Sequence, residues 1–306
     1  MKFREKLILA NTEAAYGTPE ALTGTHAILA KDVEINPLEG EELSRELDKP
    51  YLGADETILS GEHVSISFKV EMQASGAVAV APGWGVLHRA AGFVETITAL
   101  TNVVYDLAGS DYESATIHFY MGVNLHAMTG TRGSVKIIIE KGIPYFEYNF
   151  IGLHVDPSQV VTPTPDWSKF IKPFATGPGT TSGFTLNGYA ANPYALTLDV
   201  GQSVKYIQTL QSETVDINDR EASGSVRIEA PEIGTKDYFA DIKNRVTGAL
   251  SIQHGQTAGS ICKIDCPKVQ AKNPKYGDYE GNTSLDMDLV LIPTSAGNDE
   301  VKITLT

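Results

Sequence analysis

Carboxylates are the side chains of this 306-residue chain whose clustering suggests a function. They concentrate in two segments, residues 39–62 and 199–221. The first segment holds eight acids against two basic residues, and the second holds five against two, so together they carry −9 of the formal net charge of −14. Fixed negative charge repels phosphate groups, so a surface built from these segments would let a nucleic acid pass without holding it.

Polar and apolar residues alternate within both segments, which is typical of strands with one solvated face. One face of the first segment is predicted to carry Glu42, Ser44, Glu46 and Asp48, opposite Leu43 and Leu47. In the second, Asp216 shares a face with Thr214 and Asn218, opposite Val215 and Ile217. One interpretation is a pair of ordinary solvated β-ribbons. The other is that the hairpins join neighbouring copies edge to edge into a closed barrel, whose acidic face lines a channel.

The spacing of the remaining reactive residues does not indicate catalysis. The sequence has no Gly-x-Ser-x-Gly elbow, Walker A loop or Gly-x-Gly-x-x-Gly loop. Its seven histidines include no His-x-His or His-x-x-x-His pair of the kind that binds metals. A glycosidase needs two carboxylates at a fixed separation, and acids spread along ribbons imply no such pocket. We therefore expect no enzyme activity, no cofactor and no metal.

Cys262 and Cys266 are the two cysteines of the chain. In a strand they would share one face with Ile264, while Lys263 and Asp265 take the other. A disulfide between positions this close in one strand is sterically poor, and a zinc site needs more ligands. We expect two small buried residues.

The acidic segments belong to a pattern that occurs twice along the chain. Residues 65–71 and 223–229 agree in chemical type at six of seven positions. Each run leads to a short helix-like stretch ending in Arg-x-x-Gly, then to a strand-like start, and finally to an alternating strand at 145–151 or 285–291. A duplicated unit without catalytic residues is typical of proteins that build rings, rods or arrays.

Two short helices are predicted, one in each half. The first spans Gly83–Ala91, with Trp84, Leu87 and Ala91 facing inward and Gly92 ending it. The second spans Lys236–Thr247, is capped by Thr235 and ends at Gly248. Its inward face is predicted to carry Phe239, Ile242 and Val246.

These elements predict a mainly β chain of two tandem β-sandwich domains, each with one short helix and a long β-hairpin. We expect an N-terminal arm at residues 1–30, a first domain at 31–156, a proline-rich linker at 157–183 and a second domain at 184–306. A hydrophobic fraction of 42% argues against disorder. No apolar run approaches the ~20 residues that a membrane-spanning helix needs.

Four stretches resemble the major tail tube proteins of long-tailed, non-contractile (siphovirus-type) bacteriophages. They are residues 9–19, 37–41, 45–52 and 297–300. The resemblance extends over essentially the whole chain and is to the subgroup with two tube domains in one polypeptide. Its motifs are structural patterns without invariant catalytic residues.

The resemblance implies a structural subunit that closes as a homotrimeric, pseudo-hexameric ring. Stacked rings would form the tail tube, the channel for DNA ejection. It implies that Glu42, Glu46, Asp48 and Asp216 line the lumen, although a one-residue slip in register would reverse that face. The implied partners are further copies of the chain, the tape-measure protein, the tail terminator and the tail-tip proteins. Double-stranded DNA would pass without specific binding, and no membrane is involved.

The implied location is the virion tail, after assembly in the host cytoplasm from subunits that stay monomeric until other tail components nucleate them. The N-terminal arm would reach the next ring. Two alternatives remain at this point. One is the inner-tube protein of a contractile tail or secretion machine, which needs a sheath. The other is a two-domain β-sandwich module that binds carbohydrate or protein, which would need an aromatic cluster on one sheet face.

Overall fold

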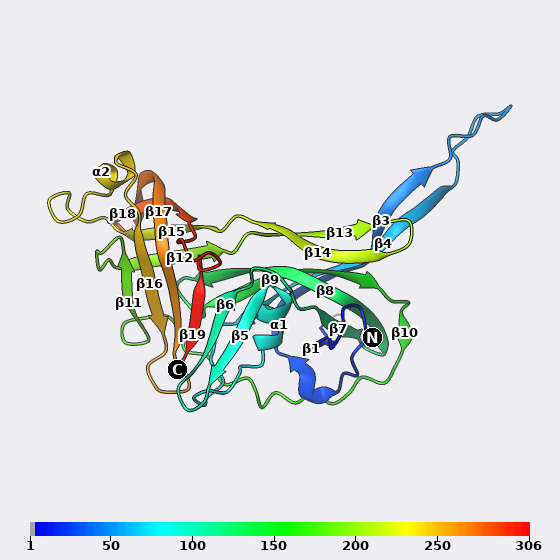
Figure 1. Ribbon diagram of the computed structural model, residues 1–306, viewed down its shortest axis with the longest axis horizontal. Coiled ribbons are helices and arrows are strands. Elements are labelled where there is room, and N and C mark those ends of the chain that lie inside the picture. The colour runs from blue at the N-terminus through cyan, green and yellow to red at the C-terminus, as the bar shows by residue number, and fades with distance from the viewer. Residues whose placement is uncertain (1–3) are drawn as a thin grey trace.

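The computed structural model describes residues 4–306 and confirms a mainly β fold. Within this range the chain forms nineteen strands, two short α-helices and one 3-10 helix, Gly24–His26. Seventeen strands belong to one hydrogen-bonded sheet system, and two form a separate hairpin. The molecule is elongated, and the hairpin of β3 and β4 projects well beyond its body (Figure 1).

Six strands of the N-terminal half pair antiparallel in the order β3–β4–β9–β8–β7–β1. Their bounds are β1 Lys6–Thr12, β3 Ala30–Ser44, β4 Thr57–Glu71, β7 Ala115–Met121, β8 Asn124–Ile139 and β9 Tyr145–His154. Three shorter additions are β2 (Ala27–Ile28) on β1, the pair β5 (Phe93–Thr98) and β6 (Asn102–Leu107), and β10 (Ser158–Gln159) on β8. Alternate residues of β4, such as Ile66 and Phe68, are buried, so one sheet face forms the core.

Six strands of the C-terminal half pair in the order β12–β15–β18–β17–β16–β11. Their bounds are β11 Thr181–Leu186, β12 Pro193–Asp199, β15 Ser223–Glu229, β16 Gly248–His254, β17 Cys262–Tyr279 and β18 Asn282–Leu291. β19 (Lys302–Leu305) pairs with β17 and β6. β13 (Gln202–Gln208) and β14 (Glu213–Arg220) form the separate hairpin. Counted along the chain, these six strands take the same places as the six of the first half.

A cross-strand row of charges repeats in the two halves and fixes which residues correspond. Each row crosses three neighbouring strands and has an acid between two basic residues. The rows are Lys69–Glu147–Lys136 on β4, β9 and β8, and Arg227–Asp286–Lys275 on β15, β18 and β17. Ion pairs form within both, at 3.5 Å for Lys69–Glu147 and 2.7 Å for Arg227–Asp286. Lys136 therefore corresponds to Lys275.

One continuous hydrophobic core runs through both halves. It contains Trp84, Phe146 and Tyr148 from the first half and Leu198 and Ile228 from the second. A division into two separate domains therefore stays a prediction, and we describe the molecule as two halves.

Helix α1 (Gly85–Ala90) agrees with the predicted first helix. Trp84, Leu87 and Ala91 are fully buried, as expected, and the Trp84 indole donates a hydrogen bond to the Gln73 carbonyl at 2.6 Å. Gly92 ends the helix with a φ of +77°. A Cβ at this position would lie 3.2 Å from the Ile217 side chain, so glycine also allows β14 to approach closely.

Helix α2 (Tyr238–Lys243) is shorter than predicted, and of its three predicted inward residues only Ile242 packs against the core. The N-cap is Asp237, not Thr235: the Asp237 carboxylate accepts a hydrogen bond from the Ala240 amide at 2.9 Å. Because the helix begins later, Tyr238 becomes its buried residue, while Phe239 and Val246 stay exposed.

The predicted N-terminal arm, residues 1–30, contains a paired and buried strand, β1. Residues 1–3 lie outside the described range, but β1 pairs along its whole length with β7, and Leu7, Ile8 and Leu9 are buried. The apolar run gives this strand its own buried surface. After it, the Glu13 carboxylate accepts four hydrogen bonds, from Gly17, Ser114, Thr116 and Gly130, which anchor the turn.

The expected linker, 157–183, lacks regular structure from residue 160 to 180. Phe170 packs against the core, whereas Trp167 and Phe174 stay partly exposed. Strand structure resumes at Thr181, two residues before the expected boundary. Cys262 and Cys266 are buried and unbonded, as predicted.

Candidate assembly surface

The two halves are joined edge to edge by a short antiparallel pairing of β8 with β12. Asp199 lies opposite Lys136, Leu198 opposite Ile137, and the Val200 amide donates to the Val135 carbonyl at 3.2 Å. The Lys136 ammonium lies 3.3 Å from the Asp199 carboxylate. Over these residues β8 stays paired with β9 on one side and takes β12 as its neighbour on the other, the side that β7 occupies nearer the start of β8.

The hairpin of β13 and β14, residues 202–220, lies across β8 and β9 of the first half, and we call it the docked hairpin. Val215 and Ile217 of this hairpin are buried on the face opposite Asp216, in agreement with the predicted alternation. The Arg132 guanidinium donates to the Asp216 carboxylate at 2.7 Å and to the Val215 carbonyl at 3.0 Å. The Tyr16 hydroxyl accepts from the Val215 amide at 2.5 Å.

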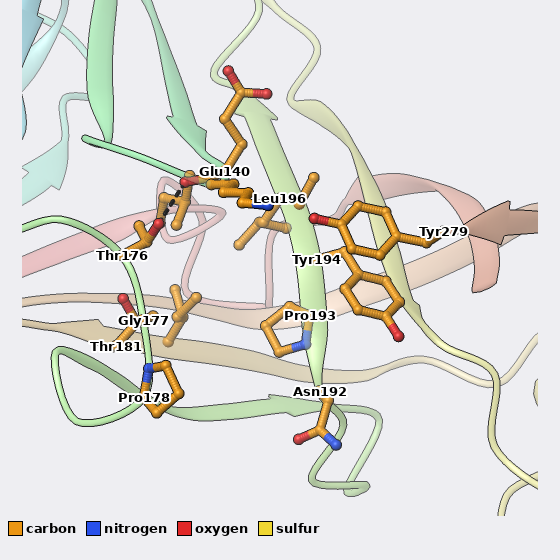
Figure 2. Close-up of a pocket in the computed structure, with 14 residues that line it drawn as sticks. Glu140, Thr176, Gly177, Pro178, Thr181, Asn192, Pro193, Tyr194, Leu196 and Tyr279 are labelled. Carbon is orange, nitrogen blue, oxygen red and sulfur yellow. Dashed lines mark hydrogen bonds between the residues drawn. The ribbon is translucent and has the colours of Figure 1, made fainter. Parts of the chain in front are cut away.

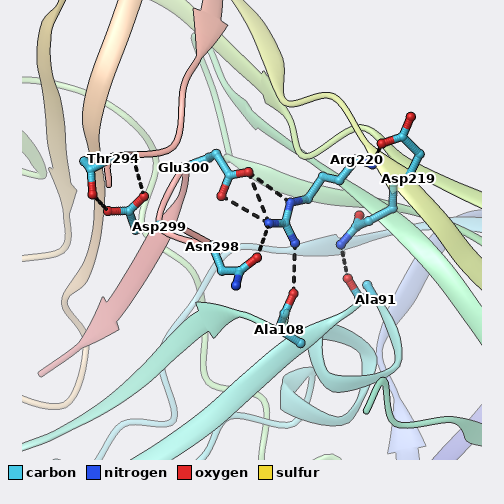
Figure 3. Close-up of polar contacts among 9 residues, drawn as sticks. Ala91, Ala108, Asp219, Arg220, Thr294, Asn298, Asp299 and Glu300 are labelled. Carbon is cyan, nitrogen blue, oxygen red and sulfur yellow. Dashed lines mark hydrogen bonds and ion pairs between the residues drawn. The ribbon is translucent and has the colours of Figure 1, made fainter. Parts of the chain in front are cut away.

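Arg220 fixes the base of the docked hairpin to two distant parts of the chain (Figure 3). Its guanidinium pairs with the Glu300 carboxylate at 3.1 Å and also donates to the Asn298 side chain and the Ala108 carbonyl. The Glu300 residue is buried, so the pair is largely removed from water. Beside it, the Gln202 side chain donates to the Ala91 carbonyl at the end of α1. The base of this hairpin is therefore held rigidly.

The corresponding hairpin of the first half, residues 37–59, extends away from the body, and we call it the projecting hairpin (Figure 1). β3 and β4 pair as far as Ser44 and Thr57, and residues 45–56 form a tip without regular structure. Every residue from Glu41 to Ile58 is exposed except half-buried Asp55. The exposed side chains include several large apolar ones: Leu43, Leu47, Tyr51, Leu52 and Ile58.

The two hairpins meet at the root of the projecting one. The His63 ring stacks on the Tyr206 ring with 4.9 Å between centroids, and the Ser60 hydroxyl donates to the Gln208 side chain at 3.4 Å. His63 also lies 3.3 Å from the Glu39 carboxylate. The docked hairpin thus supports the last paired residues before the projecting hairpin leaves the body.

The structure does not bring the four predicted lumen residues together. Glu42 lies on β3 opposite Leu59, whereas Glu46 and Asp48 lie in the irregular tip, where Glu46 has a φ of +44°. The single acidic strand face predicted through residue 48 is wrong beyond Ser44, because pairing stops there. Asp216 lies on the docked hairpin, bound by Arg132.

Sequence reasoning missed Lys136, Asp199 and Arg132, the charged residues that join the halves. The repeated cross-strand row that ends at Lys136 and Lys275 can be recognised only once the strand pairing is known. The pairing of β8 with β12 links residues about 60 positions apart, and alternation alone does not indicate which strands become neighbours.

A cavity of about 470 Å³ lies beside the junction (Figure 2). Its walls come from the turn after β8, the linker and β12, and Tyr194 stacks on Tyr279 with 4.0 Å between ring centroids. The charged groups at its rim are Glu140 and Lys141, and Lys141 pairs with Glu280 at 3.1 Å. The lining is mainly apolar, so the cavity offers packing surface at the junction.

Buried titratable groups in the described chain are poorly suited to react. Desolvation lowers the pKa of His88 to about 3, so its ring is neutral and hydrogen-bonds to the Tyr148 hydroxyl at 2.8 Å. Burial raises the pKa of the Cys262 thiol to about 12, which keeps it protonated at neutral pH. Within residues 4–306, no three His, Cys, Asp or Glu side chains lie close enough to hold a metal ion together.

The sequence matches no protein-family model and no curated protein. Among the described helices, none is long and apolar enough to span a bilayer.

Proposed function

We propose that this chain is the repeating structural subunit of a tube, the tail tube of a siphovirus-type bacteriophage through which the genome leaves the capsid. The observation that supports it most is the arrangement of the halves. They repeat one strand order and are joined edge to edge through β8 and β12. A pattern that already continues once inside the chain can continue into further copies, and closing it as a ring removes the exposed strand edges.

Three chains would supply six halves, which gives a homotrimer with pseudo-sixfold symmetry, and stacked rings would form the tube. In this proposal, the partners are other copies, the tape-measure protein, the tail terminator and the tail-tip proteins. The subunit would be assembled in the host cytoplasm and would remain in the virion tail.

The charge distribution supports passage of DNA without binding. The solvent face of the sheet carries a row in which bases and acids alternate, Lys69–Glu147–Lys136–Asp199, and its formal charges cancel. The excess of acids lies on the projecting hairpin, and we propose Glu42, Glu46 and Asp48 as the residues that keep phosphates away from the channel wall. Asp216 would add less to this field, because Arg132 neutralises it locally.

Ordering of the projecting hairpin would oppose spontaneous assembly. Its tip has no regular structure in the subunit, and fixing it costs conformational entropy, about 1–2 kcal/mol per residue for the backbone. Free subunits should therefore be monomeric when dilute. Hydrogen exchange tests this step: residues 39–62 should exchange fast in the free subunit and slowly after assembly. Strong protection of 39–62 before assembly would contradict it, whereas β1 should be protected throughout.

Negative-stain microscopy over a range of protein concentrations tests the function itself. We expect hollow rings or tubes of uniform diameter at high concentration. Monomers at every concentration, or irregular aggregates without a central hole, would contradict the proposal. The alternative of a module that binds carbohydrate or protein would need an aromatic cluster on one sheet face, and Trp84, Phe146, Tyr148 and Phe150 do not provide one because they are buried in the core.

A further inference from the structure

Among the sheet edges that have no neighbouring strand within residues 4–306, two correspond to the edges that are joined at the internal junction. One is the outer edge of β3 from Ala30 to Asn36, since β3 pairs with β4 alone. The other is the far part of β17, residues 271–279, which has β18 on one side and no paired strand on the side that β16 occupies nearer its start. Unpaired edges of this kind are templates for another strand.

Each of these two unpaired edges corresponds to an edge in the other half that is paired within the chain. β12 in the second half takes the place of β3 in the first: Asn36 lies opposite Ser65 as Asp199 lies opposite Ser223. β17 takes the place of β8, with Lys275 corresponding to Lys136 through the repeated charge row. The junction of β8 with β12 is therefore the pattern for a junction of β17 with β3, which a single chain does not make.

We infer that β3 of one copy pairs antiparallel with the far part of β17 of a second copy, with Asn36 opposite Lys275 and Ile35 opposite Tyr276. This inference rests on the proposed function and names the surfaces through which the ring would grow. The contact is head to tail, because each copy offers one β3 edge and one β17 edge.

Burial supports this register. Ile137, which corresponds to Tyr276, is 1% exposed because β12 and the shared core cover it, whereas Tyr276 is 53% exposed and is covered only in part by Phe239. Leu198 is fully buried at the internal junction, while Ile35, its counterpart on β3, is only half-buried. Docking would cover apolar positions on both edges that the internal junction already covers.

Charge supports it as well. The β17 edge carries exposed Lys272, Lys275 and Asp278, whereas the β3 edge carries exposed Lys31, Asp32 and Glu34, so their formal net charges are +1 and −1. In the inferred register Glu34 lies diagonal to Lys275 on the same sheet face, which favours pairing of these two edges over pairing of two like edges.

The same correspondence between the halves predicts where the projecting hairpin would lie. The docked hairpin follows β12 and crosses β8 and β9. The projecting hairpin follows β3, so in a second copy it would cross β17 and β18 of the first. Its exposed apolar residues Leu43 and Ile58 would then have a surface to pack on.

Disulfide trapping tests the register. The Val200–Val135 hydrogen bond makes Asp199 and Lys136 a non-hydrogen-bonded pair, for which Cα atoms lie about 4.5 Å apart, a separation that a disulfide spans. Asn36→Cys chains are mixed with Lys275→Cys chains at high concentration, oxidised and run on a non-reducing gel. We expect a reducible dimer in the mixture and none with either variant alone. Native Cys262 and Cys266 are buried and should not react.

Two controls make the result specific. Lys136→Cys/Asp199→Cys in one chain should form an internal disulfide, which shows that the geometry permits the bond. Asn36→Cys mixed with Asp278→Cys should not cross-link, because Asp278 lies about 10 Å further along the strand.

The outcomes separate the register from the function. Cross-linking of Asn36→Cys chains with one another would mean a symmetric contact and would overturn the inference. Rings without the Asn36–Lys275 cross-link would overturn it too, while leaving the tube function intact. Neither rings nor cross-links at any concentration would contradict both.

Discussion

The docked and projecting hairpins occupy corresponding places in the two halves, yet one is part of the core and the other is solvent-exposed. The docked hairpin finds β8 and β9 of the first half beneath it, and Val215, Ile217 and Arg220 are buried or nearly so. The projecting hairpin has no such platform within the described chain. The difference indicates that a hairpin of this type is stabilised by a neighbouring half, which a second copy would supply to the first half in the proposed ring.

The largest effect should follow from releasing the base of the docked hairpin. Arg220→Ala leaves the buried Glu300 carboxylate without its partner, which should lower the free energy of unfolding by about 3 kcal/mol. Urea denaturation measures this loss. The matched change on the projecting hairpin, Arg45→Ala, should stay within about 0.5 kcal/mol of the unchanged chain. Equal effects for the two variants would show that the hairpins do not differ as described.

The next largest effect should come from the apolar face of the docked hairpin. Ile217→Ala removes a side chain that is 5% exposed and should lower the free energy of unfolding by about 2 kcal/mol. Ile58→Ala, on the projecting hairpin, removes a side chain that is 55% exposed and should change the stability of the monomer by less than about 0.5 kcal/mol. In assembled protein, however, Ile58→Ala should weaken association, which sedimentation at several concentrations would detect. An Ile58→Ala monomer as unstable as Ile217→Ala would break the comparison.

A smaller effect is expected at the junction of the halves. Lys136→Ala removes a solvent-screened ion pair with Asp199 and should lower the free energy of unfolding by less than about 1 kcal/mol. Lys275→Ala should leave the monomer's thermal unfolding unchanged and weaken self-association instead. If both variants affect the monomer alike and assembly not at all, Lys275 is not the counterpart of Lys136.

The smallest effect should appear with pH at the charge row of the second half. The hydrogen bond from Arg227 holds the pKa of Asp286 below its ordinary value. A depressed folded pKa means that the contribution is present above the unfolded pKa, about 3.9, and is lost as pH falls through the folded pKa. Asp286→Asn should reduce the free energy of unfolding that is lost on acidification by less than about 1 kcal/mol. Thermal melts between pH 6 and 2 would show it, and a profile identical to that of the unchanged chain would contradict it.

Much of this fold could be predicted from the sequence because its signals are local. Alternation located the strands that carry residues 65–71 and 223–229, and it placed Val215 and Ile217 inward correctly. Trp84 and Leu87, which are three residues apart, were assigned to a buried helix face, and both are buried.

The incorrect predictions concern features that depend on a competing residue nearby or on a partner far along the chain. Asp237 took the cap position expected of Thr235 and moved the start of α2. The apolar residues of β1 were read as part of an arm, because their partner β7 lies more than 100 residues away. The acidic face assumed through Asp48 ended at Ser44, since a proline- and glycine-containing tip does not continue the pairing. The junction between the halves depends on long-range pairing and had no local signal.

Cryo-electron microscopy of concentrated protein tests the central claim most directly. The account predicts closed rings of three chains around an open axial channel, with the sheet of each copy running into that of the next through β3 and β17. A density map in which associated chains enclose no channel, or in which the halves of neighbouring copies do not meet edge to edge, would contradict it.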